Sequence, residues 1–172
     1  MIARSNDAKA IGIEMGVPRF QCEHLIKKYN IEVCSPNFCL YGDFSERVMD
    51  IASEFSPNSE IYSIDEIFLS YFGFNEDPVK YAKEIRLRIK RDTGLPVSIG
   101  IGPTKTLAKA ANRIAKKLPA AAEGVFYLSD EATINASLEK IDVQDIWGIG
   151  PEKSQFLKRQ GIDNALQLKN GA

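Results

Sequence analysis

The sequence predicts an α+β fold, in which a small sheet with its covering helices is followed by a helical segment. Two short segments point to strands, because residues 61–72 and 97–101 are rich in Ile, Val, Phe, Tyr and Leu. An amphipathic helix precedes them, since apolar side chains recur at i, i+4, i+7, i+8 and i+11 from Phe44 to Phe55. From Glu131 onward only short helical patterns follow.

The composition is that of an ordinary globular chain. The 172 residues are 44% hydrophobic and 26% charged, and no apolar run approaches the roughly 20 residues that span a bilayer. We therefore expect no membrane association, and we expect no signal peptide because the opening residues 1–7 contain no apolar h-region. The cysteines, Cys22, Cys34 and Cys39, are odd in number and form no CxxC pair, which argues against a disulfide framework. We expect buried thiols and a cytoplasmic protein.

Three helices are expected in the first 60 residues, over 6–13, 21–29 and 43–55. Glycine, proline and asparagine, which break helices or begin turns, lie at their ends. The segment 31–41 between the second and third helices is interpreted as extended. The third helix is therefore expected to begin directly after it, at Gly42.

Residues 61–72 are predicted to form two strands that meet at the acidic dipeptide Asp65-Glu66. A helix is expected after them, because Asp77 is a typical N-cap and is followed by proline. This helix should end near Gly94, where the chain turns into the next strand.

The order strand–strand–helix–strand over 61–101 fits the second part of a split βαβ, ferredoxin-like sheet. The helix 43–55 is expected to pack against that sheet. The first strand of such a unit should precede the opening helices, so the sheet formed by this sequence is expected to be incomplete.

A basic helix is predicted after the turn at Gly102, because apolar side chains again recur at helical spacing. The apolar stripe comprises Leu107, Ala111, Ile114 and Leu118, and the basic face comprises Lys105, Lys109, Arg113 and Lys116. No acidic residue interrupts the basic segment, although the whole chain has a net charge of −1. A cationic row suits contact with phosphate, since helix N-termini and cations both attract anions. The alternative is a surface helix that only meets solvent.

The sequence also contains a glycine-rich turn between two predicted helices. The elements expected before it are a linker over 119–124 and a short strand over 125–128. The turn itself, Gly148-Ile149-Gly150, is typical of a helix-hairpin-helix, whose glycines let the backbone approach a phosphate. The following helix offers free N–H groups, and Lys153 adds a charge. The alternative is a plain αα-hairpin, whose glycines only permit the turn.

The acidic dipeptide can bind a metal ion if it lies where the chain turns. Adjacent residues in a strand face opposite ways, whereas at a strand end Asp65 and Glu66 can face one cation. Mg²⁺ prefers such hard oxygen ligands, and two ions can activate a 3′-hydroxyl and stabilise a leaving pyrophosphate. The alternative is a solvated acidic turn. His24 is the only histidine, which excludes histidine-based clusters and triads, and we expect Trp147 to pack rather than to stack on a base.

In this order the features resemble the Y-family translesion DNA polymerases of the bacterial UmuC (ImpB/MucB/SamB) branch, over essentially the whole chain. Residues 62–66, Tyr-Ser-Ile-Asp-Glu, are similar to a palm motif of that family. Residues 100–109, Gly-Ile-Gly-Pro-Thr-Lys-Thr-Leu-Ala-Lys, are similar to a second palm segment. The opening residues 2–13 resemble the fingers, and 147–150, Trp-Gly-Ile-Gly, resemble the thumb hairpin.

The resemblance implies fingers over 1–36, a palm over 37–123 and a thumb over 124–172. It implies that Asp65 and Glu66 are catalytic and bind two Mg²⁺ ions. The implied nucleotide-binding residues are Asn6, Lys9 and Lys116, and the expected DNA contacts are Lys105, Lys109, Gly148, Gly150 and Lys153. Many relatives carry arginine where this chain has Lys9, so a looser contact with the triphosphate is expected there.

The same resemblance implies two parts that this sequence lacks, a first palm strand of the type Asp-x-x-x-Phe-Tyr and a C-terminal little-finger domain. We expect the full-length protein to polymerise DNA past damaged bases in the SOS response, and this fragment alone to be inactive. Implied partners are primer-template DNA and deoxynucleoside triphosphates. A sliding clamp, a UmuD-like accessory subunit and a recombinase filament are further partners by analogy.

Two other functions are compatible with the sequence. A DNA-binding remnant would use the helix-hairpin-helix alone and bind duplex without sequence preference, more weakly as salt rises. A nucleotide cyclase or signalling domain can be built on a similar sheet, but it needs no duplex grip of the kind predicted at 146–153.

Overall fold

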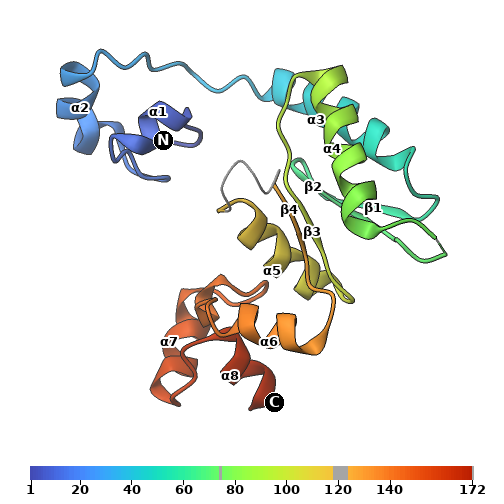
Figure 1. Ribbon diagram of the computed structural model, residues 1–172. Helices are drawn as coiled ribbons and strands as arrows, with labels where there is room; N and C mark the ends of the chain where they lie inside the picture. The colour runs from blue at the N-terminus through green and yellow to red at the C-terminus, as the bar shows by residue number, and fades with distance from the viewer. Residues whose placement is uncertain (74, 118–123, 172) are drawn as a thin grey trace. The chain divides into compact units, whose positions relative to one another are not determined.

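The computed structural model describes residues 1–73, 75–117 and 124–171, except for the side chain of Asn6 (Figure 1). Leu118 and most of the predicted linker 119–124 therefore lie outside the described residues. The chain divides into two compact units, Met1–Gly42 and Asp43–Ala172. Among the described residues, one apolar core lies in the first unit and two lie in the second.

The first unit contains two short helices around a small core. They are α1, Asn6–Ala10, and α2, Arg19–Lys28, which confirms both predicted helices, although α1 ends earlier than expected. The core comprises Ala8, Ile13, Cys22 and Ile26. The N-terminal ammonium donates a hydrogen bond to the carbonyl oxygen of Val17 at 2.6 Å, which ties the start of the chain to the loop before α2.

The third helix begins earlier than predicted. Helix α3 covers Phe38–Ser53, and the side-chain oxygen of Asn37 accepts a hydrogen bond from the amide of Leu40 at 3.0 Å. Asn37 thus caps the helix, and Gly42 lies inside it rather than at its start. The expectation of buried thiols was wrong for Cys34 and Cys39, which are exposed, because neither contributes to a core.

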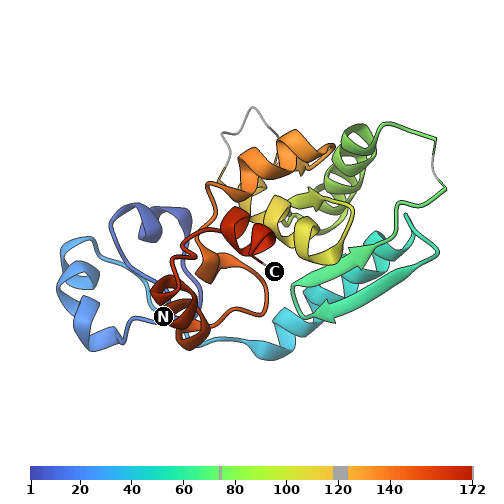
Figure 2. The same ribbon diagram turned by 90° about the horizontal axis from the view of Figure 1, so that it is seen from below.

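The second unit starts with the predicted hairpin. Strand β1, Ser59–Ser63, pairs antiparallel with β2, Glu66–Leu69, and the Cα partners nearest the turn are Ser63 and Glu66. The turn therefore consists of two residues, Ile64 and Asp65. Figure 2 shows this hairpin lying over α3. The prediction that two strands meet at the acidic dipeptide is confirmed.

A βαβ arrangement follows the hairpin. Helix α4, Pro78–Thr93, is capped by Asp77 as predicted. Strands β3, Ile99–Ile101, and β4, Val125–Tyr127, are parallel neighbours, and helix α5, Lys105–Ala115, lies between them in the chain. Parallel strands need such a crossover.

Strand β3 and α5 pack so closely that only glycine fits at position 100. A Cβ added there would lie 2.0 Å from the backbone nitrogen of Asn112 and 2.3 Å from the carbonyl oxygen of Ala108. Both contacts are to backbone, so side-chain rearrangement cannot relieve them. Gly100 therefore fixes how close α5 lies to the strand.

The strands form two separate pairs, β1–β2 and β3–β4, rather than the single sheet expected. Residues of both β2 and β3 line a groove of ≈ 970 Å³. Helices α3 and α4 cover one shared core, in which Ala52, Ile85 and Ile89 contact Ile67 of β2 and Ile99 of β3. Side-chain packing thus holds the two pairs together.

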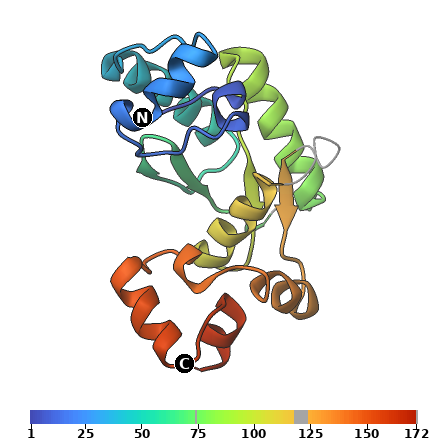
Figure 3. The ribbon, with the colours of Figure 1, turned by 90° about the vertical axis from the view of Figure 1, so that its left-hand side faces the viewer.

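The C-terminal part of this unit is helical, as predicted. It contains α6, Glu131–Leu138, the 3₁₀ helix η2, Val143–Asp145, α7, Pro151–Arg159, and α8, Ala165–Asn170. Figure 3 shows these helices grouped beyond α5 at one end of the unit. Their core includes Ala110 and Ala111 of α5, and Leu107 and Ile114 of the predicted apolar stripe are partly buried against it. None of the helices in the described part of the chain is long and apolar enough to cross a membrane.

Candidate active site and nucleic-acid interface

The acidic dipeptide lies at the tip of the β1–β2 hairpin. Asp65 is exposed in the turn, and its Oδ1 accepts a hydrogen bond from the Ser63 hydroxyl at 2.7 Å. Glu66 is the first residue of β2, and its side chain is 28% exposed. The two neighbouring carboxylates therefore differ, since one is open to solvent and the other is partly enclosed.

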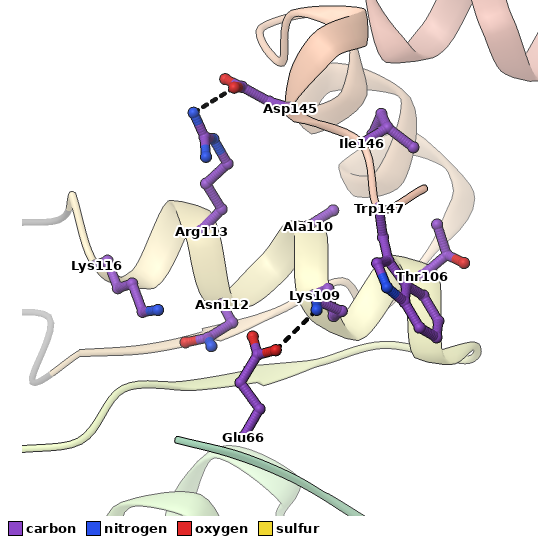
Figure 4. A pocket seen from close by; sticks show the side chains of 10 residues that line it. All are labelled: Glu66, Thr106, Lys109, Ala110, Asn112, Arg113, Lys116, Asp145, Ile146 and Trp147. Atoms are coloured by element: carbon purple, nitrogen blue, oxygen red, sulfur yellow. Dashed lines mark hydrogen bonds and ion pairs between the residues drawn. The ribbon is translucent and has the colours of Figure 1, made fainter. Parts of the chain in front are cut away.

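Glu66 is paired with a lysine of the basic helix. The Nζ of Lys109 donates to Oε2 of Glu66 at 2.8 Å, and the side chain of Lys109 is only 22% exposed. The same ammonium lies 4.6 Å from the centroid of the Tyr62 ring and 5.0 Å from that of Trp147. Figure 4 shows Glu66, Lys109 and Trp147 side by side. One cation thus joins the hairpin, α5 and the segment before α7.

Tyr62 reaches this cluster from an irregular point in β1. The register of the hairpin shifts between Ile61 and Ser63, which places a bulge at Tyr62. Its ring packs against Phe68 and Trp147, with centroids 5.8 and 5.2 Å apart, and its hydroxyl accepts a hydrogen bond from the Trp147 indole at 3.0 Å. Trp147 is therefore a packing residue in this structure, as expected.

A pocket of ≈ 230 Å³ lies between α5 and the segment that follows η2 (Figure 4). Arg113 on its wall is ion-paired with Asp145, the last residue of η2. Lys116 lines the same pocket, and no ion-pair partner for it is found among the described residues. With Glu66 and Asp145 already neutralised by their partners, Lys116 gives the pocket a positive charge.

Lys105, one turn before Lys109, is also paired with the hairpin. Its ammonium contacts the carboxylate of Glu60 and lies 5.3 Å from the centroid of the Phe68 ring. Lys105 and Lys109 line the larger groove together with Asp65. Two of the cations expected to contact DNA therefore bind acidic residues of the same chain in this structure.

The glycine-rich turn leads into α7 without a side-chain cap. Gly148 has a positive φ of 88°, and Gly150 is the N-cap residue of α7, with φ −87°. Since Gly150 has no side chain, it cannot satisfy the N–H groups of the first turn. Lys153 lies in that turn, and its ammonium donates to the carbonyl oxygen of Gly148 at 3.2 Å. Free amides and one cation thus lie together at this helix start.

The remaining predicted residues belong to the first unit. Lys9 is exposed near the end of α1. Asn6 begins α1, and its side chain lies outside the described part of the structure. The structure thus brings Glu66, Lys109 and Lys116 to one pocket but does not relate Lys9 to them.

The donor groups at the hairpin tip fit part of a magnesium shell. Asp65 and Glu66 supply hard carboxylate oxygens, of which Mg²⁺ uses one or two, with phosphates and waters as its other ligands. The described residues contain no cluster of three or more acidic, histidine or cysteine side chains able to hold a metal. One oxygen of Glu66 also accepts the Lys109 hydrogen bond. The two residues therefore suit a cation that arrives with a phosphate ligand, not a cage made by the protein alone.

Sequence reasoning missed the acidic partners of the basic helix and the role of Tyr62. Glu60, Glu66 and Asp145 lie 45, 43 and 32 positions from their partners, and ion pairs at such separations leave no local pattern in a sequence. In the sequence, Tyr62 stands out only as part of the motif at 62–66. No local pattern along β1 marks it, because Tyr62 is the single aromatic residue of that strand.

The whole chain is similar to several characterised proteins. It is 40% identical over 173 residues to protein ImpB of Salmonella typhimurium and 40% identical over 170 residues to protein UmuC of the same species. It is 37% identical over 171 residues to a DNA polymerase IV of Picrophilus torridus. Each alignment covers 98% of this chain, but only 40%, 40% and 47% of the relatives. The chain therefore spans less than half the length of these curated relatives.

Solved structures show the same fold. The chain matches Dbh DNA polymerase in an insertion ternary complex with a TM-score of 0.78 and 24% identity, over 93% of this chain and 45% of that one. It matches DinB from Sulfolobus solfataricus with a TM-score of 0.73 and 25% identity, over 92% and 45% of the two chains. The profile of the impB/mucB/samB family matches residues 1–113. The chain belongs to the impB/mucB/samB family.

Proposed function

We propose that the complete protein is a DNA-directed DNA polymerase of the Y-family that carries out translesion synthesis. The observation that carries this proposal is the acidic tip of the hairpin, Asp65 and Glu66, next to the cationic helix α5 in a chain of this family. The relatives include proteins named DNA polymerase IV and UmuC, which supports the same activity. The SOS response and a cytoplasmic location are proposed on the same resemblance.

In this proposal Asp65 and Glu66 hold Mg²⁺ together with the phosphates of the substrate. When bound, the metal supplies activation of a primer 3′-hydroxyl and stabilisation of the leaving pyrophosphate. Lys116 lines the pocket beside Glu66 and binds the triphosphate as a point charge. Asn6 and Lys9 are proposed to contact the same phosphates from the fingers. The three-part division at 1–36, 37–123 and 124–172 is part of the proposal, although β4, in the thumb range, pairs with β3 of the palm range.

The DNA contacts proposed for the C-terminal helices centre on a helix-hairpin-helix. Gly148 and Gly150 let a phosphate approach the backbone, the uncapped amides of α7 bind it, and Lys153 adds a cation. Lys105 and Lys109 would reach phosphate only after leaving Glu60 and Glu66. A sliding clamp, a UmuD-like subunit and a recombinase filament are proposed as partners by family analogy alone.

Primer extension by the complete protein tests the polymerase proposal. A primer-template with an abasic site, Mg²⁺ and all four deoxynucleoside triphosphates should give products that pass the lesion. Asp65→Asn should abolish them, whereas Asp50→Asn, which changes an exposed aspartate on α3, should not. Extension by Asp65→Asn at the rate of the unmodified protein would rule out Asp65 as a metal ligand.

A second candidate function is sequence-independent DNA binding by the helix-hairpin-helix. The observation in its favour is the uncapped start of α7 with Lys153 beside it. It predicts that the 172-residue chain binds duplex DNA. It also predicts that Lys153→Gln reduces the slope of the logarithm of the DNA-binding constant against the logarithm of the salt concentration by about 0.9. Lys158 lies on the same helix but is paired with Asp142 at 2.7 Å, so Lys158→Gln is the matched control. Equal slopes for both variants would exclude a phosphate contact by Lys153.

A further inference from the structure

We propose that Lys109 is a positioning residue for Glu66, held in place by the rings of Tyr62 and Trp147, and that it is not a DNA-phosphate ligand. The proposal deepens the proposed function, because it rests on a role for Glu66 in nucleotidyl transfer. Its structural part can nevertheless be tested without any polymerase activity.

The ion pair of Lys109 is the most enclosed among those found in the described residues. The side chains of Lys109 and Glu66 are 22% and 28% exposed, whereas those of Lys105 and Glu60 are 47% and 57% exposed. Exposed ion pairs contribute little to stability, because solvent screens their charges and both side chains lose conformational freedom. A partly buried pair with a direct hydrogen bond is harder to break, since each partner would be left without its counter-charge.

Two aromatic rings complete the environment of the ammonium. The Tyr62 and Trp147 centroids lie 4.6 and 5.0 Å from Nζ, within the range of cation–π attraction. The rings meet edge to face at 88°, and the indole N–H donates to the tyrosine hydroxyl, so each ring fixes the other. Lys109 is therefore held from three sides, by β1, β2 and the segment before α7.

The same helix offers a comparison. Lys116 lines the same pocket, yet no ion-pair partner is found for it in the described residues. A phosphate that approached α5 would bind Lys116 without breaking an existing contact, whereas binding Lys109 would leave Glu66 partly buried and unpaired. The two lysines therefore differ in role. Lys116 is available to bind an anion, whereas Lys109 is paired with the carboxylate of Glu66.

This arrangement has a direct consequence for Glu66. Its Oε2 accepts the lysine hydrogen bond, which fixes the orientation of the carboxylate and leaves Oε1 for another ligand. Groups that hold a ligating carboxylate typically change affinity or activity 10- to 100-fold when removed. Loss of Lys109 should therefore impair the chemical step and spare DNA affinity.

The structural part can be measured in the 172-residue chain, in which Trp147 is the only tryptophan. Lys109→Met should change the emission of Trp147, whereas Lys116→Met should leave it unchanged. In urea unfolding, Lys109→Met and Glu66→Gln should be non-additive, because each removes the same contact. Unchanged emission together with additive effects would overturn the proposal, whether or not the protein is a polymerase.

The functional part is measured with the complete protein. Lys109→Met should lower kcat for single-nucleotide incorporation about 10- to 100-fold, with the salt dependence of DNA binding unchanged. Lys109→Arg should restore most of the rate, since guanidinium pairs with carboxylate and stacks on aromatic rings. If Lys109→Met instead reduced the slope of log binding constant against log salt concentration by about 0.9, as expected for one lost phosphate contact, Lys109 would be a DNA-phosphate ligand. Absence of incorporation by the unmodified protein would contradict the proposed function, while the emission and unfolding results would still decide the contact.

Discussion

The indole nitrogen of Trp147 donates a hydrogen bond to the hydroxyl of Tyr62, 85 positions earlier in the chain, at 3.0 Å. This contact joins the residue before the glycine-rich turn to the strand that carries the acidic tip. The two segments with the most specific sequence motifs are therefore in direct contact. Trp147 also lies 5.0 Å from the Nζ of Lys109, which pairs with Glu66, so the glycine-rich turn and the acidic tip share one cluster of contacts.

Removing this hydrogen bond should destabilise the chain modestly. Tyr62→Phe keeps the ring and removes only the hydroxyl, so it should cost about 0.5–1 kcal/mol, the low end for a net hydrogen bond at a partly exposed site. Trp147→Phe removes the same hydrogen bond and part of the ring contacts, so it should cost more. Because both remove the same hydrogen bond, the double variant should cost less than the sum of the two single effects. Urea unfolding followed by circular dichroism measures this. Fully additive losses would show that the bond does not form in solution.

The contact between β3 and α5 should make Gly100 intolerant of any side chain. Gly100→Ala forces a Cβ against the backbone of Asn112 and Ala108, and we expect a loss of about 3 kcal/mol or more. Gly42→Ala is the control, because a Cβ at this position in α3 meets nothing within 4 Å and alanine favours a helix. Thermal unfolding of both variants gives the comparison. A Gly100→Ala chain as stable as Gly42→Ala would contradict the close packing.

The two glycines of the turn should respond differently to alanine. Gly148 has a φ of +88°, so Gly148→Ala should destabilise the chain by roughly 1–2 kcal/mol. Gly150 has an ordinary φ of −87° and open space around it, so Gly150→Ala should cost less than Gly148→Ala, because only the weaker N-cap preference of alanine opposes it.

DNA binding gives the second half of that test. A methyl group at position 150 keeps a phosphate from approaching the uncapped amides of α7, so Gly150→Ala should weaken binding of the 172-residue chain to duplex DNA. Fluorescence anisotropy with a labelled duplex measures the affinity. Unchanged binding by Gly150→Ala would favour a plain αα-hairpin over a helix-hairpin-helix.

The N-cap of α6 should make stability depend on pH in the acid range. Hydrogen bonds from Ser129 and from the amide and hydroxyl of Thr133 lower the pKa of Asp130 to about 2. Because this pKa lies below the unfolded value, the stabilisation is present above about pH 4 and is lost as the pH falls through 2. The advantage of the unmodified chain over Asp130→Asn in urea unfolding should therefore shrink between pH 4 and pH 2. A constant difference across that range would show that the ionised cap does not contribute.

The elements governed by local chemistry could be predicted from the sequence. The caps and turns, such as Asp77 before α4 and the dipeptide at the hairpin tip, depend on neighbouring residues only. The predicted start of α3 at Gly42 was wrong, because Asn37 caps a helix that continues through Gly42. From the sequence alone, a helix break at Gly42 is equally plausible, because glycine is a weak helix former.

The long-range contacts could not be predicted. The residue types of the site were found, yet nothing near Lys109 in the chain reveals its pairing with Glu66, which depends on how α5 packs on the hairpin. The separation of the strands into two pairs likewise depends on tertiary packing around Ile67 and Ile99. Such contacts belong to the packed fold rather than to any local pattern.

The two carboxylates of the hairpin tip, Asp65 and Glu66, are proposed to act together in one reaction. The most direct test is the single-turnover rate of nucleotide incorporation by the complete protein, compared with Asp65→Asn, Glu66→Gln and the double variant. Each single change should lower the rate by more than about 100-fold, the upper end for groups that only support a ligand. The double variant should be little worse than the slower single one, because the two residues serve one site. An Asp65→Asn protein that incorporates nucleotide at the unmodified rate would contradict the account.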